Sequence, residues 1–176
     1  MTDFHSAEAS VADAAFRPPT VLAVAGRIGR VRYLAYSFAG MLVVMLAAAV
    51  LGGALGAAGA TEQIGGALLQ VVVGALVLAL TLIVARRRLN DMGRTGWWGL
   101  FLLVPILNIV ATVWLVFGKG DAGPNQYGLP PGPNSRGAIV LACVGPVVFI
   151  GAILVSGRDA YRSYGDKARP SNSQTF

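Results

Sequence analysis

The hydrophobic pattern of this chain is a series of long apolar runs separated by short polar segments. Four runs contain no charged residue and are 18 or more residues long, covering residues 34–60, 64–85, 97–117 and 138–155. Helices buried in a soluble protein rarely remain apolar on every face over such a length. The 22 residues of the second run would span roughly 33 Å at ~1.5 Å each, enough for a ~30 Å hydrocarbon core. The pattern predicts an all-α, polytopic membrane helix bundle with four transmembrane helices.

Composition supports a membrane location. The chain is 55% hydrophobic and only 12% charged, against the ~25% charged residues of a typical soluble domain. A soluble domain of 176 residues could not hide that much apolar surface, because small domains leave a large share of their surface in water. Lipid is the second apolar solvent that this excess requires.

The basic residues predict an orientation. Four precede the first run, four lie between the second and third, and four follow the fourth, whereas only Lys119 and Arg136 fall in the other two links. With four crossings, twelve basic residues lie on one side and two on the other, and the positive-inside rule makes the richer side cytoplasmic. We therefore expect both termini in the cytoplasm. The net charge of +6 is then explained without nucleic acid.

The densest polar segment covers residues 86–98 and is predicted to be a turn between helices at the head groups. Asp91 is its only acid, and we expect it to pair with an arginine; bidentate geometry would make that pair rigid. One interpretation is a built anionic pocket for a lipid head group or a partner's carboxylate. The other, favoured by chemistry alone, is a topology signal with a structural ion pair. The candidate lipid- or partner-binding residues here are Arg87, Arg88, Asp91, Gly93, Arg94, Gly96, Trp97 and Trp98.

Three ordered motifs in this sequence resemble the DUF805 family of small bacterial inner-membrane proteins. The motifs are Gly26-Arg27-Ile28-Gly29-Arg30-x-Arg32-Tyr33, Arg87-Arg88-Leu89-Asn90-Asp91-x-Gly93-Arg94-Thr95-Gly96-Trp97-Trp98 and Gly123-Pro124-Asn125-Gln126-Tyr127-Gly128. The resemblance implies an inner-membrane location and no mechanism. Two departures stand out: Asn90 replaces the histidine of many members, which weakens any proton-transfer role, and the fourth run lies beyond the usual family end.

These observations divide the chain into four parts. Residues 1–25 are predicted to be a disordered N-terminal tail, and residues 26–130 a DUF805-like membrane domain. Residues 131–156 hold the additional transmembrane helix, and residues 157–176 form a basic C-terminal tail.

The link of residues 118–137 is rich in Gly, Pro and Asn and is predicted to be an irregular loop. On a four-helix topology it lies outside the cytoplasm. Asn125 and Tyr127 are candidates for contact with a periplasmic partner. The alternative is a proline-stiffened turn that packs over the helix ends.

Few polar residues interrupt the apolar runs. Gln70, Asn108 and Thr112 are candidates for a permeation path or, as we favour, for interhelical hydrogen bonds. Proton or ion coupling normally needs ionisable residues, which these runs lack. Glycines at residues 52, 56, 66 and 74 predict close helix packing within a tight hairpin or a homo-oligomer.

The leading functional interpretation is a non-enzymatic membrane component that acts through protein or lipid contacts at the inner face. Its expected partners are anionic membrane lipids and a protein partner or a second copy of the chain. A small channel or transporter is the alternative. An enzyme ranks third. Nucleophilic chemistry needs a positioned base, and with His5 in the predicted tail only Asp91 remains, which is expected to pair with an arginine. No cofactor or metal is expected, since Cys143 and His5 are the only residues of their kinds and zinc needs about four ligands.

Overall fold

The computed structural model describes residues 23–59 and 64–168, and this part of the chain is all-α apart from one isolated bridge. The predicted disordered tail falls almost entirely outside the described residues. The elements are α2 (Arg30–Ala57), α3 (Ile64–Asp91), the 3-10 helix η1 (Gly96–Leu103), α4 (Pro105–Phe117) and α5 (Arg136–Ala168). The predicted fold class, an all-α polytopic bundle, is confirmed.

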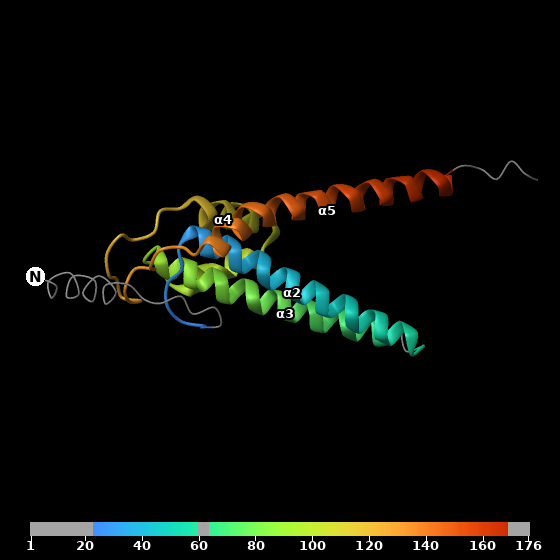
Figure 1. Ribbon diagram of the computed structural model, residues 1–176, viewed down its shortest axis with the longest axis horizontal. Coiled ribbons are helices and arrows are strands. Elements are labelled where there is room, and N and C mark those ends of the chain that lie inside the picture. Colours follow the sequence, from blue (N-terminus) through green and yellow to red (C-terminus); the bar gives the residue numbers. More distant parts are fainter. Residues whose placement is uncertain (1–22, 60–63, 169–176) are drawn as a thin grey trace, which may run out of the picture.

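Three of these helices are long and apolar enough to cross a membrane: α2, α3 and α5. Only 6%, 6% and 11% of their most apolar windows is buried inside the protein. Nearly all of that apolar surface therefore faces outward, as lipid requires. Helices α2 and α3 lie side by side along their length, while α5 starts beside them and diverges (Figure 1). The last residues of α5 continue as helix into the predicted basic tail.

The third apolar run is not a single helix. Helix η1 has 8 residues, or about 16 Å at ~2.0 Å each. Helix α4 has 13 residues, or about 20 Å at ~1.5 Å each. Neither length reaches across a ~30 Å core. The four-helix count is therefore not confirmed.

The two short helices run in and back as a re-entrant hairpin, the name used below for residues 96–117. Helix η1 starts just after the end of α3, and Leu115 near the end of α4 accepts a hydrogen bond from Arg88 of α3. Residues 118–137 therefore lie at the same end of the bundle as residues 86–96. The expectation that these two links face opposite sides is wrong.

Pro105 explains the break. It lacks an N–H, and its ring keeps the preceding residue out of the helical region; Val104 is extended, with φ −98° and ψ 119°. The turn leaves the Leu102 carbonyl without a helical partner, and Asn108 Nδ2 donates to it at 2.6 Å. Thr112 Oγ1 in turn contacts Asn108 Oδ1 at 3.4 Å. Asn108 thus satisfies irregular backbone at membrane depth, rather than forming the expected interhelical bond.

Small residues set how closely the helices approach. A Cβ added at Gly52 of α2 would meet Leu69 of α3 at 3.5 Å, while one added at Gly74 would meet nothing within 4 Å. Gly52 therefore serves the α2–α3 hairpin, and Gly74 does not. Helix α5 packs on α2 where an added Cβ at Gly145 would lie 2.6 Å from Phe38 Cγ.

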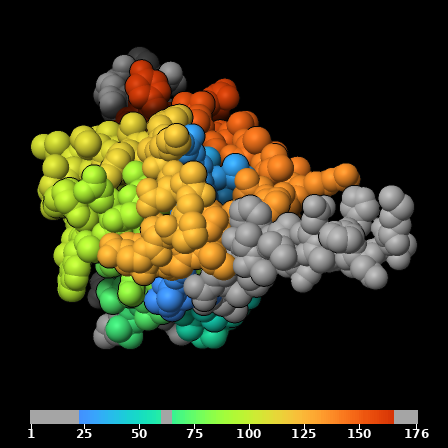
Figure 2. Space-filling model, turned by 90° about the vertical axis from the view of Figure 1, so that its left-hand side faces the viewer, coloured from blue at the N-terminus to red at the C-terminus, as the bar shows by residue number. Residues whose placement is uncertain are grey.

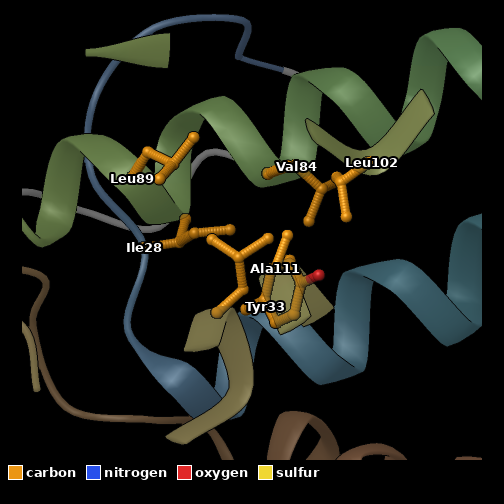
Figure 3. Close-up of a cluster of buried hydrophobic side chains, with 8 residues drawn as sticks. Ile28, Tyr33, Val84, Leu89, Leu102 and Ala111 are labelled. Carbon is orange, nitrogen blue, oxygen red and sulfur yellow. The ribbon is translucent and has the colours of Figure 1, made fainter. Parts of the chain in front are cut away.

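The buried core lies at one end of the molecule, which we call the motif end because the three motifs meet there. Figure 3 shows Ile28 and Tyr33 packed against Val84 and Leu89 of α3, with the re-entrant hairpin closing over them through Leu102 and Ala111. At the opposite end of the molecule, α2 connects to α3.

Candidate functional site

Three segments that are far apart in sequence converge at the motif end. They are residues 23–33 before and at the start of α2, residues 86–98 around the end of α3, and the loop of residues 118–135 between α4 and α5. Figure 2 views this end, where the yellow-orange loop crosses the face with the blue N-terminal segment beside it. Hydrogen bonds within and between these segments form a polar cluster of Arg27, Arg88, Asp91, Asp121 and Asn125.

Asp91 is the centre of the polar cluster and pairs with two arginines. Its Oδ2 accepts from Arg88 Nη1 at 2.5 Å, and its Oδ1 lies 3.2 Å from both Arg27 Nε and Nη2. All three side chains are at most 4% exposed. The predicted pairing of Asp91 with an arginine is confirmed, and two arginines share the carboxylate, each engaging a different oxygen, so neither pair is bidentate. A buried carboxylate between two guanidinium groups is stable only while both partners remain.

Arg27 connects the first motif to the third. Its Nη1 donates to the carbonyls of Gly123 at 2.7 Å and Gly128 at 3.1 Å, and its Nη2 donates to the carbonyl of Asp121 at 2.6 Å. One guanidinium thus satisfies three loop carbonyls in addition to Asp91, which uses the fixed fork of arginine and could not be reproduced by lysine.

Arg88 completes the end of α4. Its Nε donates to the Leu115 carbonyl at 2.9 Å and its Nη2 to the Gly118 carbonyl, and Arg30 Nε donates to the same Gly118 oxygen at 2.9 Å. The last carbonyls of a helix have no partner within the helix and carry its negative end charge. Arginine donors therefore hold the returning arm of the re-entrant hairpin against α3.

The end of α3 is closed by its own backbone. Gly93 has φ +68°, and the Gly93 and Arg94 amides donate to the Asn90 and Leu89 carbonyls, the pattern of a Schellman cap. This conformation favours glycine.

The loop of residues 118–135 adds further hydrogen bonds to the capped end of α3. Asn125 Nδ2 donates to the Asn90 carbonyl at 2.9 Å, and the Asp121 amide donates to the Asp91 carbonyl at 2.7 Å. Tight packing makes glycine necessary at position 120, where an added Cβ would lie 2.2 Å from Asp91 Oδ2.

The structure separates the sequence-predicted site residues into three groups: buried residues, residues that shape turns, and exposed residues. Arg87, Arg88 and Asp91 are buried and belong to the fold; Arg87 lies over the Tyr36 ring, 5.9 Å from its centroid. Gly93 and Gly96 shape the turn, and Asn125 and Tyr127 form an asparagine turn, with Asn125 Oδ1 accepting from the Tyr127 amide. The exposed group at the surface is Arg94, Trp97 and Trp98.

Sequence reasoning missed the structural role of three residues outside the predicted binding set, Arg27, Arg32 and Asn90. Arg27 and Arg32 are 5% and 3% exposed, and Arg32 donates to the Pro133 carbonyl. Asn90 is also buried and donates to the Gly26 carbonyl at 3.2 Å. That contact needs only a donor, which both an asparagine amide and a histidine ring can supply. The available signal was the excess of arginines over acids in the three motifs taken together.

Within residues 23–59 and 64–168, no group of three or more His, Cys, Asp or Glu side chains could hold a metal ion. The cavity beside Asp91, of about 420 Å³, is lined by Arg30, Lys119 and Asp121 among others. Asp91 already accepts from two arginines. The cationic side chains beside this cavity can therefore make contacts with anions.

The comparisons with known proteins identify the segment that contains the three motifs. The family model described as "Protein of unknown function (DUF805)" matches residues 21–129, which include all three. Among the curated proteins and the solved structures nothing matches. The match ends before α5, which begins at Arg136. Because the matched segment is more than half of the chain, the chain belongs to the DUF805 family.

Proposed function

We propose that this protein is a non-enzymatic component of the inner membrane that acts through protein or lipid contacts made by its motif end at the cytoplasmic face. The observation that carries the proposal is the division of the arginines there. Arg27, Arg32, Arg87 and Arg88 are buried, while Arg86 and Arg94 are exposed beside the interfacial Trp97. A fold that needed arginine only for its interior would not require the exposed pair.

The orientation rests on the charges of the described residues. Nine arginine and lysine residues lie in the segments of the motif end, up to and including Arg136, whereas three lie on the far part of α5: Arg158, Arg162 and Lys167. The positive-inside rule then favours the motif end in the cytoplasm. With three crossings and a re-entrant hairpin, the end of α5 lies on the opposite side. This replaces the sequence expectation that both termini share one side.

A channel or transporter is supported less well. Gln70 and Asn108 do line one cavity of about 560 Å³ between α2, α3 and the re-entrant hairpin. No residue lining it is ionisable, and coupled transport usually uses ionisable groups. The Asn108 amide is also already engaged by the turn. Contact at the exposed cationic surface therefore remains the proposed function.

The experiment compares what the protein retains on purification. The full chain is extracted with its surrounding lipids, and co-purifying lipids and proteins are identified by mass spectrometry. The double variant Arg86→Gln, Arg94→Gln removes the two exposed arginines beside Trp97 without touching the polar cluster. The matched control, Arg158→Gln with Arg162→Gln, removes two exposed cations from α5. We expect only the first variant to lose a retained lipid or partner. Equal retention by parent and both variants contradicts the proposal.

The topology is tested by labelling single cysteines in intact cells. Cys143 is the only native cysteine, so Cys143→Ala provides the background. A membrane-impermeant maleimide should label Tyr164→Cys, which is exposed on α5, but not Lys119→Cys, which is exposed in the motif-end loop. Labelling of Lys119→Cys alone would restore the four-crossing topology.

A further inference from the structure

A third cavity, of about 330 Å³, lies between the two arms of the re-entrant hairpin. Helix η1 contributes Trp98 and Phe101 to its wall, and α4 contributes Leu107, Val110 and Trp114. The single charged residue lining it is Arg94. The result is an apolar groove with one cation, inside a segment that enters and leaves the membrane from the same end.

The aromatic walls of this groove hold one another in place. The Trp98 ring meets Phe101 at 5.3 Å and Trp114 at 5.9 Å between centroids, both edge to face. Such aromatic pairs contribute beyond their buried area. Trp98 and Phe101 remain 43% and 42% exposed, so the groove is preformed and still accessible from the lipid side.

The cation is fixed by its backbone while its side chain stays free. The Arg94 amide donates to the Leu89 carbonyl at 2.9 Å as part of the turn that closes α3. Among the described residues none forms a hydrogen bond or ion pair with the Arg94 guanidinium, in contrast to Arg27 and Arg88. An exposed guanidinium beside an apolar groove is suited to bind an anion that carries an apolar chain.

A second cation lies nearby. An added Cβ at Gly96 would fall 2.5 Å from Arg86 Cγ, so the Arg86 stem lies directly over Gly96. This places two exposed arginine side chains on the turn between α3 and η1, and Trp97 beside them is 78% exposed. Asp91, the one acid of this segment, is held by Arg27 and Arg88. Arg94 is the only charged residue that lines the groove, so the charge of its lining is positive.

We propose that this groove binds an anionic glycerophospholipid, with its phosphate at Arg94 and Arg86 and part of one acyl chain against Trp98, Phe101 and Trp114. The inference rests on the proposed function and specifies its ligand. Lipid is favoured over a protein segment because large apolar side chains surround the groove on both arms, among them Leu100, Leu103 and Ile106 at 44%, 49% and 78% exposure. Basic pockets between membrane helices on the cytoplasmic side are known to bind acidic head groups.

The test uses the tryptophans as reporters. Of the three in the chain, Trp97→Phe leaves Trp98 and Trp114, which both line the groove. This full-length variant is placed in phosphatidylcholine vesicles. Increasing fractions of either brominated phosphatidylglycerol or brominated phosphatidylcholine are then included. Bromine in the acyl chain quenches tryptophan fluorescence on contact. We expect half-maximal quenching at a fraction of brominated phosphatidylglycerol about fivefold lower than that of brominated phosphatidylcholine, the attraction of about one arginine to an anionic lipid.

Arg94→Gln should abolish most of that fivefold preference, while Arg162→Gln, an exposed arginine on α5, should keep it. Unchanged far-ultraviolet circular dichroism confirms that both variants fold. A preference that survives in Arg94→Gln, or equal quenching by the two lipids in the parent, overturns the lipid site. Neither result depends on a protein partner, so the proposed function could fail or stand separately on the retention experiment.

Discussion

The motif end and the membrane-crossing parts of α2, α3 and α5 are stabilised by different kinds of contact. At the motif end, almost every polar group of the polar cluster has a named partner, and the hydrophobic core of the protein lies directly beneath it. Along the crossing helices, side chains are mostly exposed, and contact is limited to a few close approaches such as Gly52 with Leu69. The first region specifies the fold, and the second depends on lipid to cover it.

The difference follows from where backbone groups need partners. A continuous helix satisfies its own amides and carbonyls, so α2 and α3 can cross lipid with little help. The motif end contains two helix ends, a re-entrant hairpin and an irregular loop, all of which leave carbonyls without helical partners. Arg27 and Arg88 donate to five of these carbonyls between them. The basic motifs are therefore needed by the geometry of the chain at this end, apart from any topology signal.

The sharpest way to break the comparison is Asp91→Asn, which removes the one negative charge from between Arg27 and Arg88. Taking one partner from a buried ion pair costs about 3–5 kcal/mol. We expect that loss in the free energy of unfolding, measured by denaturant titration in micelles. Asp159→Asn, which changes an exposed acid on α5, should cost less than about 0.5 kcal/mol. If the two variants are equally stable, the polar cluster does not specify the fold.

A second test is steric and uses two glycines of the same loop. Gly120→Ala places a methyl group 2.2 Å from Asp91 Oδ2, whereas Gly123→Ala meets nothing within 4 Å. Overpacking of this kind costs about 1–3 kcal/mol, so we expect Gly120→Ala to lower the unfolding midpoint and Gly123→Ala to leave it nearly unchanged. Similar midpoints would show that the loop does not pack on α3.

The parts of the fold that sequence could predict are those set by local pattern. The runs at residues 34–60, 64–85 and 138–155 correspond to α2, α3 and α5, with ends displaced by a few residues or by a turn or more, because helices continue through charged segments at the head groups. The pairing of Asp91 with Arg88 was also within reach, since the two are three residues apart on one helix.

What sequence could not predict depends on direction and on distant partners. Hydropathy treats residues 97–117 alike whether the chain crosses or returns, so the re-entrant hairpin was missed, although Pro105 marks the break. The pair of Arg27 with Asp91 joins residues 64 apart in sequence, and no local pattern selects one arginine among many. The predicted binding set consequently mixed buried residues such as Arg88 with exposed ones such as Arg94. A variant in which lysine replaces both Arg88 and Arg94 would disturb folding and binding together, so it could not distinguish the two roles.

A third test concerns the turn of the re-entrant hairpin. Asn108→Leu removes the donor to the Leu102 carbonyl and leaves that oxygen without its partner, at about 1–2 kcal/mol. Thr112→Val, one turn further along α4, removes only the long 3.4 Å contact with Asn108 and should change stability by a few tenths of a kcal/mol. Denaturant titration in micelles measures both. A Thr112→Val effect as large as that of Asn108→Leu would mean that the polar pair, and not the turn, is what matters.

The smallest expected effect lies in the crossing region, at the contact of α5 with α2. Gly145→Ala brings a methyl group within 2.6 Å of Phe38 Cγ, and the Phe38 ring also packs at a tilt against Phe149, with 6.2 Å between centroids. Gly151→Ala on the same helix meets nothing within 4 Å. Because α5 packs only on α2 among the described helices, it can move away without disturbing α3, so we expect a loss of about 1 kcal/mol or less.

The movement of α5 away from α2 is measurable even where the change in the free energy of unfolding is small. Spin labels on Val50→Cys and Leu154→Cys, both exposed, report the separation of the two helices in a Cys143→Ala background. Gly145→Ala should lengthen or broaden that distance distribution, and Gly151→Ala should leave it as in the parent. Unfolding of the motif end should be unaffected by either, since the polar cluster draws on α3, α4 and the loop and not on α5. A loss of motif-end stability in Gly145→Ala would show that α5 supports the family domain, and the contrast between the two regions would then be incomplete.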